Sequence, residues 1–237
     1  MDPELAPYLL PGSTVESAHP AVVKFARAHT QPDAGPRKTA VALYYAVRDG
    51  IRYDPYSAVL TTDGLRASGV LAAGRAWCVP KAVLLAAACR SQGIPARLGF
   101  ADVRNHLSTT RLRERMQSEV FYWHGYTSIH LDGRWVKATP AFNVELCAKF
   151  GLVPLEFDGR SDSLYHSFDR AGKRHMEYLH ARGEYADVPL DAMRDTFREK
   201  YPQMYGALVA AGAASLGDAD FGRDVEKEVA AAAGRSR

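Results

Sequence analysis

Apolar residues recur at helical spacing in two segments near the beginning of the chain. These segments, 19–29 and 37–50, each place their apolar side chains on one face of a helix. In the second segment Leu43 and Val47 share that face, and Gly50 is expected to end the helix. The pattern therefore predicts two amphipathic helices before residue 51.

A third helix is predicted to begin near Cys78, in an alanine-rich run. Pro80 fixes where it starts, because proline is tolerated only in the first turn of a helix, where its missing N–H is not needed. Gly93 followed by Pro95 marks its end. Cys78 is thus expected at the helix N-terminus.

Strand patterns surround and follow this helix. Residues 51–56 are expected to be extended because Asp54 precedes a proline, and residues 96–103 alternate as in a strand. Residues 121–143 give the strongest β-hairpin signal, since two β-rich runs are joined by Asp-Gly, a pair suited to a type I′ turn. The polar stretch 104–119 is expected to be a loop or a short exposed helix.

The remainder of the chain has weaker patterns. Residues 151–187 lack a sustained period and are expected to form an irregular surface extension. Residues 189–205 carry apolar residues at helical spacing, with Asp187 as a candidate N-cap. Alanine, glycine and charged residues dominate from Gly206 onward, which predicts a weakly packed tail. The order of helices, strand, loop and hairpin predicts an α+β fold.

Composition limits the function further. The chain has 237 residues, of which 47% are hydrophobic, so it can bury the core of one domain with appendages. Its net charge of +3 is too small to indicate a nucleic acid as a partner. The longest apolar run, 82–89, is too short to span a membrane, and the acidic N-terminal residues do not resemble a secretory signal. A cytoplasmic protein is expected.

Three cysteines, Cys78, Cys89 and Cys147, favour reduced thiols over a disulfide framework. A helix N-terminus lowers the pKa of a thiol, so Cys78 is a candidate nucleophile; the alternative is that it is a small buried apolar residue. Cys89 lies in mid-helix and is expected to be structural. Zinc binding is disfavoured because no CxxC or HxxxH spacing occurs, and no cofactor is expected.

A nucleophilic cysteine needs a base, and the hairpin offers two histidines. His124 and His130 point to the same side of a regular strand. They are about 20 Å apart along that strand, so only one can approach a given sulfur. Strand spacing alone does not choose between them.

The hairpin register provides a candidate for orienting one histidine. If Asp132 and Gly133 form the turn, Tyr126 pairs with Thr139, which makes Thr139 a diagonal neighbour of His124. The Thr139 hydroxyl is then expected to accept a hydrogen bond from the His124 ring. The alternatives are that Thr139 is an ordinary strand residue, or that Asn143 on the other diagonal has this role.

The landmarks occur in an order that resembles the transglutaminase-like superfamily of papain-fold cysteine enzymes. They are "YYAVRDGIRYD", "GRAWC", "GIPARLGF" and "WHGYTSIHLDGRWVKATPAFN", which together span residues 40–143. The resemblance implies a papain-like core with its helix packed on an antiparallel sheet. It further implies that Cys78 is the nucleophile and that His124, followed by Gly125 and an aromatic residue, is the base.

The resemblance also reveals a departure from the family. Where the family has an aspartate before a proline, this chain has Thr139-Pro140. Threonine accepts a hydrogen bond but cannot stabilise an imidazolium by charge, so a weaker cysteine–histidine ion pair is expected. The expected catalytic set is Cys78, His124 and Thr139; the alternatives are that another group supplies the charge or that activity has been lost.

The resemblance implies a cysteine hydrolase or acyl transferase that acts on amide or peptide bonds through a thioester. The alternative is an inactive peptide-binding module that keeps the cleft. A peptide or protein amide is the expected partner, with no nucleic acid and no membrane; the oligomeric state and the substrate's identity stay open. The expected domain is 1–205, with a core at 37–145, an extension at 146–205 and a tail at 206–237.

Overall fold

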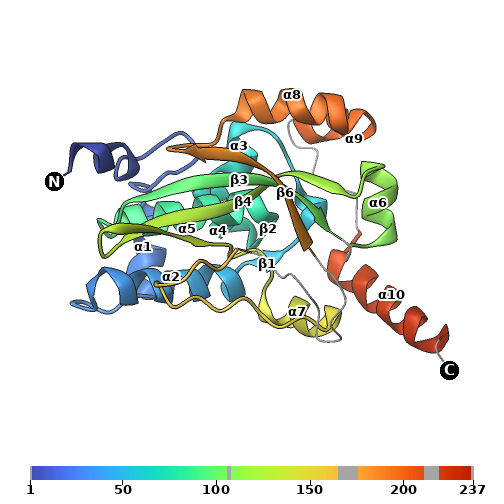
Figure 1. Cartoon of the computed structure of the whole chain (residues 1–237), viewed down its shortest axis with the longest axis horizontal. Coiled ribbons are helices and arrows are strands. Elements are labelled where there is room, and N and C mark those ends of the chain that lie inside the picture. Colours follow the sequence, from blue (N-terminus) through green and yellow to red (C-terminus); the bar gives the residue numbers. More distant parts are fainter. Residues whose placement is uncertain (1, 106–107, 165–175, 211–218, 236–237) are drawn as a thin grey trace.

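One central helix, α5, lies between a β-sheet and a layer of helices (Figure 1). The structure is a computed structural model that describes residues 2–105, 108–164, 176–210 and 219–235. Within this part of the chain the α-helices are α1 (Pro20–Ala28), α2 (Gly35–Gly50), α3 (Thr62–Leu65), α4 (Ala67–Ala73), α5 (Cys78–Ser91), α6 (Thr110–Met116), α7 (Val144–Phe150), α8 (Leu190–Lys200), α9 (Pro202–Val209) and α10 (Phe221–Arg235). Two short 3-10 helices, Pro3–Tyr8 and Pro55–Ser57, complete the helical elements.

The strands form two sheets. The larger is four-stranded and antiparallel, with the order β5-β4-β3-β6. Its strands are β3 (Ala96–Asn105), β4 (Val120–Leu131), β5 (Arg134–Ala138) and β6 (Met176–Tyr185). The smaller pairs β1 (Arg52–Tyr53) with β2 (Arg75–Ala76) in parallel. This arrangement confirms the predicted α+β fold.

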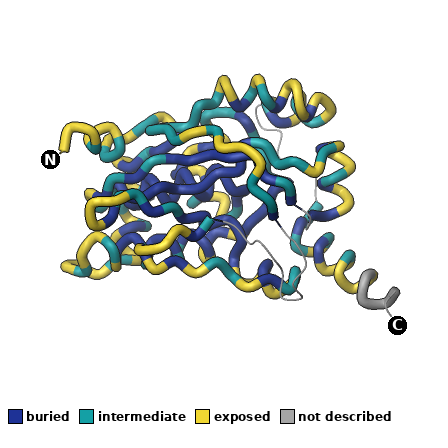
Figure 2. Tube along the Cα trace, in the orientation of Figure 1, coloured by how far each residue is buried: buried dark blue, intermediate teal, exposed yellow. Residues whose placement is uncertain are grey.

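Helix α5 is buried on every side (Figure 2). All its residues from Cys78 to Arg90 are buried, because α1, α2 and α4 pack on one side and strands β3 and β4 on the other. Its many alanines allow the strand to approach closely, and the Thr127 hydroxyl donates a 2.9 Å hydrogen bond to the Ala82 carbonyl. The helix ends where predicted, with Gly93 in the left-handed region at φ +72°.

Helix α2 ends at Gly50, as the sequence predicts, and a buried lysine caps it. The Lys81 ammonium donates hydrogen bonds to the carbonyls of Arg48 and Ile51 at the C-terminal end of α2. A cation is favoured there because the last carbonyls of a helix lack intrahelical donors. Burial nevertheless lowers the pKa of Lys81 to about 7.

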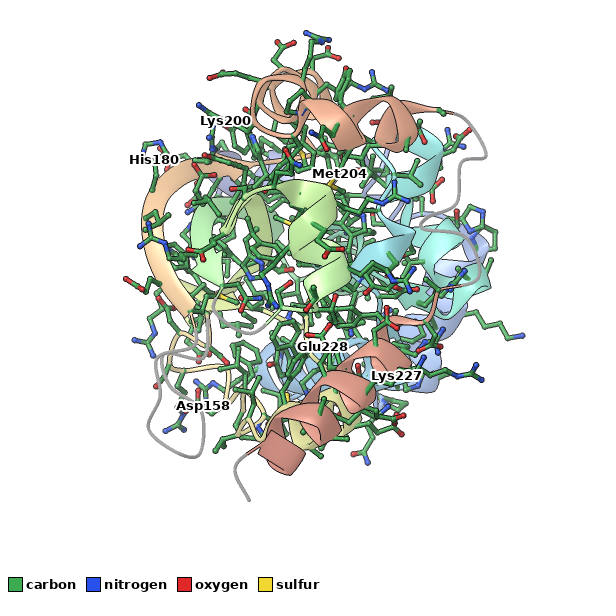
Figure 3. The ribbon with its side chains drawn as sticks, turned by 90° about the vertical axis from the view of Figure 1, so that its right-hand side faces the viewer. Asp158, His180, Lys200, Met204, Lys227 and Glu228 are labelled. Atoms are coloured by element: carbon green, nitrogen blue, oxygen red, sulfur yellow. The ribbon has the colours of Figure 1, made fainter. Side chains whose placement is uncertain are left out.

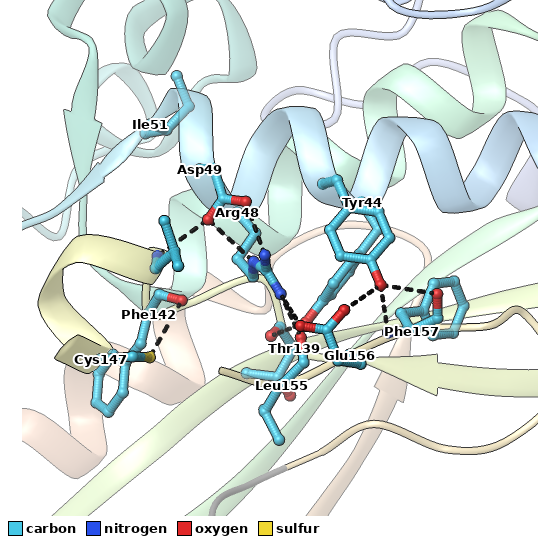
Figure 4. Close-up of polar contacts among 12 residues, drawn as sticks. Tyr44, Arg48, Asp49, Ile51, Thr139, Phe142, Cys147, Leu155, Glu156 and Phe157 are labelled. Carbon is cyan, nitrogen blue, oxygen red and sulfur yellow. Dashed lines mark hydrogen bonds and ion pairs between the residues drawn. The ribbon is translucent and has the colours of Figure 1, made fainter. Parts of the chain in front are cut away.

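A polar cluster joins α2 to the segment that follows the hairpin (Figure 4). The Arg48 guanidinium forms ion pairs with Asp49 at 2.7 Å and Glu156 at 3.2 Å, and donates to the Leu155 carbonyl. Asp49 in turn accepts from the Val144 backbone N–H at the start of α7. Residues 144–157 are thereby attached to the outside of α2.

The hairpin turn has the predicted geometry. Leu131 pairs with Arg134, and Asp132 and Gly133 have φ values of +50° and +79°, as a type I′ turn requires. The ladder ends at the pair Thr127–Ala138, however, so the predicted pair Tyr126–Thr139 is not part of it. The Thr139 backbone N–H instead donates to the Ser163 carbonyl at 2.8 Å.

Two expectations for the later part of the chain are wrong. The segment 151–187, expected to be an irregular extension, contains strand β6. This strand pairs with β3 from the pair Leu98–Tyr185 to the pair Asn105–Met176. Asp187 does not cap α8, whose N-cap is Pro189; its carboxylate instead accepts hydrogen bonds from Ser13 and Thr14 near the N-terminus. Residues 165–175 lie outside the described residues.

The region after Val209 also differs from the weakly packed tail that was expected. In helix α10, Phe221 and Val225 are buried, and the Phe221 ring packs against the rings of Tyr53 and Tyr56. Residues 211–218 lie outside the described part of the chain. No described helix has both the length and the apolar character needed to cross a membrane.

Candidate active site

Cys78 is the first residue of α5, and strand β4 passes directly over this helix end. A Cβ built on Gly125 would lie 3.0 Å from the Val79 Cα atom and 3.2 Å from its Cγ2 atom. Only glycine therefore allows the strand so close to the helix. Gly125, which directly follows His124, thus allows β4 to contact Val79, which directly follows Cys78.

Two opposing effects act on the Cys78 thiol. Burial raises the pKa of Cys78 to about 11, whereas hydrogen bonds from the backbone N–H groups of Gly125, Val79 and Cys78 itself lower it. Burial is the larger effect, so the change is opposite in direction to the sequence-based expectation. The helix N-terminus favours the thiolate as expected, but loss of hydration on burial disfavours it more, so the thiol is expected to be protonated at neutral pH.

His124 lies on β4 beside an irregularity in the strand pairing. His124 pairs with Ala101, but the next pair is Val103 with Phe121, so β4 carries one extra residue. Trp123 takes up this bulge with a φ of +60°, a backbone conformation that side chains rarely adopt. The regular alternation expected for the strand is therefore broken just before His124.

An acidic side chain holds the bulge in place. Asp102 of β3 accepts a 3.2 Å hydrogen bond from the Trp123 backbone N–H. The same carboxylate binds both arms of the Arg182 guanidinium from β6, at 2.7 and 2.8 Å. The guanidinium also lies 5.0 Å from the centre of the Trp123 ring. Three strands thus fix the backbone next to His124.

Cys78 and His124 line the same cavity. The other residues that surround it are mostly apolar: Tyr53, Pro55, Ala58, Trp77, Leu112, Met116, Phe121, Tyr122, Phe197, Tyr201, Met204 and Leu208. The cavity has a volume of about 60 Å³, room for only a few water-sized groups. Cys78 is 7% exposed and His124 is 5% exposed, so α6, α8 and α9 cover the pair.

The other sequence-predicted residues lie elsewhere. Thr139 is 4% exposed and does not line the cavity, and within the described part of the chain its hydroxyl has no hydrogen-bond partner. Asn143 uses its side-chain carbonyl to accept from the Tyr53 backbone N–H at 3.2 Å. The His130 ring packs on Trp135, outside the cavity.

The sequence did not reveal as site residues Asp102, Arg182 or the cavity residues Phe197, Tyr201, Met204 and Leu208. Asp102 lies in an alternating strand pattern and Arg182 in a segment without a period, so only the strand pairing brings them together. The polar segment 104–119 did contain a signal, since Leu112 and Met116 are four residues apart and share a helix face. Both are buried and line the cavity.

A comparison with known protein families assigns part of the chain to a family. The family model of the transglutaminase-like superfamily matches residues 23–140, which hold both Cys78 and His124. A comparison with curated protein sequences gave no match. Residues 23–140 form a transglutaminase-like superfamily domain, whose core packs a helix on an antiparallel sheet.

One solved structure is similar over much of the chain. It is described as "a Putative Cysteine Protease from Cytophaga hutchinsonii", with 17% sequence identity and a TM-score of 0.47. The similarity covers 78% of the present chain and 55% of that protein, so the chain spans little more than half of its length.

Proposed function

We propose that this protein is a cysteine-dependent hydrolase or acyl transferase that acts on amide or peptide bonds. Cys78 is the nucleophile and His124 the general base. The observation that carries this proposal is that both side chains line one cavity, where the sulfur lies at a helix N-terminus and accepts hydrogen bonds from backbone N–H groups.

The reaction has two halves. His124 removes the thiol proton, and the Cys78 sulfur attacks the carbonyl carbon to form a C–S bond; the C–N bond then breaks, and the amine leaves with the proton from the imidazolium. Water or a second amine next attacks the thioester. The C–S bond breaks and the proton returns to Cys78 through His124, which restores the enzyme.

Thr139 has a smaller part in this proposal. It stands where the family has an aspartate, and its hydroxyl, which has no hydrogen-bond partner among the described residues, would have to turn to the His124 ring to serve as a neutral acceptor. A neutral acceptor stabilises an imidazolium less than a carboxylate does. The thiolate–imidazolium pair is therefore expected to be a minor state before substrate binds.

A second candidate function, a binding module without turnover, is favoured by two observations. Burial keeps the thiol protonated, with a pKa of about 11, and the carboxylate that would favour the ion pair is replaced by Thr139. Such a module would bind a peptide in the cleft without forming a thioester.

Intact mass spectrometry after exposure to an acyl-directed activity probe separates the two functions. The parent protein is expected to gain the mass of one probe molecule, and Cys78→Ala is expected to gain none. Cys89→Ala is expected to show the same mass gain as the parent, because Cys89 is buried in mid-helix. A folded parent protein that gains no mass would support the binding module instead.

A further inference from the structure

The cavity beside Cys78 adjoins a second one, and we infer that together they bind an unbranched aliphatic acyl group, the part of the substrate that becomes attached to Cys78. This inference rests on the proposed function and names its substrate class. The two cavities share five wall residues: Pro55, Ala58, Leu112, Met204 and Leu208.

The shared wall contains no polar side-chain atom. Two of its backbone carbonyls are already engaged: that of Leu208 accepts a 2.6 Å hydrogen bond from the Leu60 backbone N–H, and that of Pro55 accepts a 3.3 Å hydrogen bond from the Ala58 backbone N–H. A carboxamide or a charged group placed there would lose its hydration without gaining hydrogen bonds from side chains. A methylene chain loses nothing and gains from leaving water.

Polar side chains also line the first cavity, among them Tyr53, Tyr201 and Trp77. The Tyr201 hydroxyl is engaged, since it donates to the Val120 carbonyl at 2.6 Å and accepts from the Tyr122 backbone N–H at 3.0 Å. The Trp77 indole N–H is buried and has no hydrogen-bond partner among the described residues, but it is only a donor. The reacting carbonyl belongs at this end, beside Cys78 and His124.

The flexible methionine side chain in the cavity wall, and its position between α6 and α9, favour an unbranched acyl chain. Met204 lies where α9 meets α6 (Figure 3), opposite Leu112 and Met116 of α6. Methionine side chains adapt to slender apolar groups because they are unbranched and flexible. Beyond the shared wall the second cavity reaches the exposed Arg115, so a longer chain would run toward solvent along the seam between α6 and α9.

Cys78 can be acylated by any activated acyl donor, including an aryl ester. The Cys78 sulfur forms a bond to the acyl carbon, the bond to the leaving phenol breaks, and the phenol departs as phenolate while His124 holds the thiol proton. Water then breaks the thioester and releases the fatty acid. The leaving group departs, whereas the chain stays in the cavity until hydrolysis.

The test is kcat/KM for p-nitrophenyl esters of acetate, butanoate and hexanoate, with the rate of Cys78→Ala subtracted. The kcat/KM for the butanoate ester is expected to be about ten times that for the acetate ester, because burial of its two additional methylene groups favours binding of the acyl chain. A matched pair tests polarity: the 4-methylpentanoyl ester against the 3-carbamoylpropanoyl ester, which has the same branched skeleton but carries an amide. The apolar member is expected to be faster by roughly 10–100-fold.

Met204→Trp fills the shared wall and is expected to reduce the hexanoate rate by about tenfold or more while changing acetate little. Gln203→Trp is the matched control, because this neighbour is exposed and does not line either cavity; its chain-length preference should equal the parent's. Met204→Ala should extend the preference toward longer chains.

The outcomes separate the two ideas. If no ester gives a rate above Cys78→Ala, the proposed function fails and this inference with it. If Cys78-dependent turnover occurs but acetate equals butanoate, or if the amide-bearing ester is as fast as its apolar partner, the proposed function stands and the acyl-chain inference is overturned.

Discussion

Position 125 sets the distance between the strand that carries His124 and the helix that carries Cys78. In Gly125→Ala the new methyl group would meet the Val79 backbone at 3.0 Å, so strand and helix must separate. The free energy of unfolding is expected to fall by about 1–3 kcal/mol. Labelling of Cys78 by the acyl probe should slow more than the stability loss explains, because the Gly125 N–H moves away from the sulfur.

Gly206→Ala is the control for this substitution. No atom lies within 4 Å of a Cβ at Gly206, and the residue is exposed in α9. Alanine is there expected to leave the protein unchanged or more stable by up to about 1 kcal/mol. Urea unfolding of both variants measures the difference, and equal stabilities would show that the close contact at Gly125 is not limiting.

The raised pKa of Cys78 predicts how its reactivity depends on pH. Because burial raises that pKa to about 11, labelling by limiting iodoacetamide should increase steadily from pH 7 to pH 10 without a plateau. Cys89 has a pKa raised to about 12 by burial, so Cys78 should still react first. Peptide mapping by mass spectrometry gives both rates; a plateau near pH 7 would mean that His124 activates the thiol in the resting protein.

The same shifts affect stability. A thiol whose pKa is higher in the folded than in the unfolded protein stabilises the fold fully at pH values below its unfolded pKa, near 9. As the pH rises toward the folded pKa this stabilisation is lost, because the thiol ionises in the unfolded chain but not yet in the folded protein. The free energy of unfolding is thus expected to fall between about pH 9 and pH 11.

At the residue scale, local patterns were enough to place Cys78 at a helix start but not to choose its base. Pro80 fixed the helix start, whereas only the resemblance to the transglutaminase-like superfamily selected His124 over His130, and the roles of Cys78 and His124 stay a prediction. The pKa direction of Cys78 was not predictable from the sequence, because it depends on the cover provided by residues more than a hundred positions later in the chain.

At the element scale, Asp102 is a positioning residue for β4. Asp102→Ala removes the acceptor of the Trp123 N–H and leaves Arg182 without its carboxylate. The expected loss in the free energy of unfolding is about 3 kcal/mol. The bulge should also relax, so that kcat for the preferred ester falls while its KM changes little.

Asp195→Ala is the control for an ion pair without this role. Asp195 pairs with Arg198 on the exposed face of α8, and such pairs contribute little. Neither stability nor turnover should change measurably. If Asp102→Ala kept full turnover in a folded protein, the bulge would have no part in orienting His124.

The elements that the sequence predicted well have local causes. Helix periodicity predicted α1 and α2, Pro80 and Gly93 bounded α5, and Asp132-Gly133 predicted the hairpin turn with the register next to it. Strand β6 was missed because its residues are mostly half-exposed and do not alternate, so only pairing with β3 defines it. The Tyr126–Thr139 pair failed because Pro140 has no N–H and the chain turns toward Ser163 at this point.

On the scale of the whole molecule, the C-terminal part of the chain completes a site that begins in the family core. Residues 23–140 supply Cys78 and His124, whereas α8 and α9 supply one wall of the cavity. Helix α10 reaches the opposite wall indirectly: Asp224 binds Arg111 at 2.9 Å, and Glu228 accepts from the Thr110 N–H at the start of α6. The cavity therefore depends on contacts between distant segments.

Phe221, a buried residue of α10, provides a test of this dependence. Its ring packs against Tyr53, which lines the cavity, and against Tyr56. Phe221→Ala is expected to lower the free energy of unfolding by about 3–5 kcal/mol. Because α10 also holds α6, the variant should lose its preference for butanoate over acetate even where it is folded. Val229→Ala, on the same helix and 44% exposed, should change neither quantity beyond about 0.5 kcal/mol. Equal behaviour of the two variants in urea unfolding and ester kinetics would instead support the weakly packed tail that the sequence indicated.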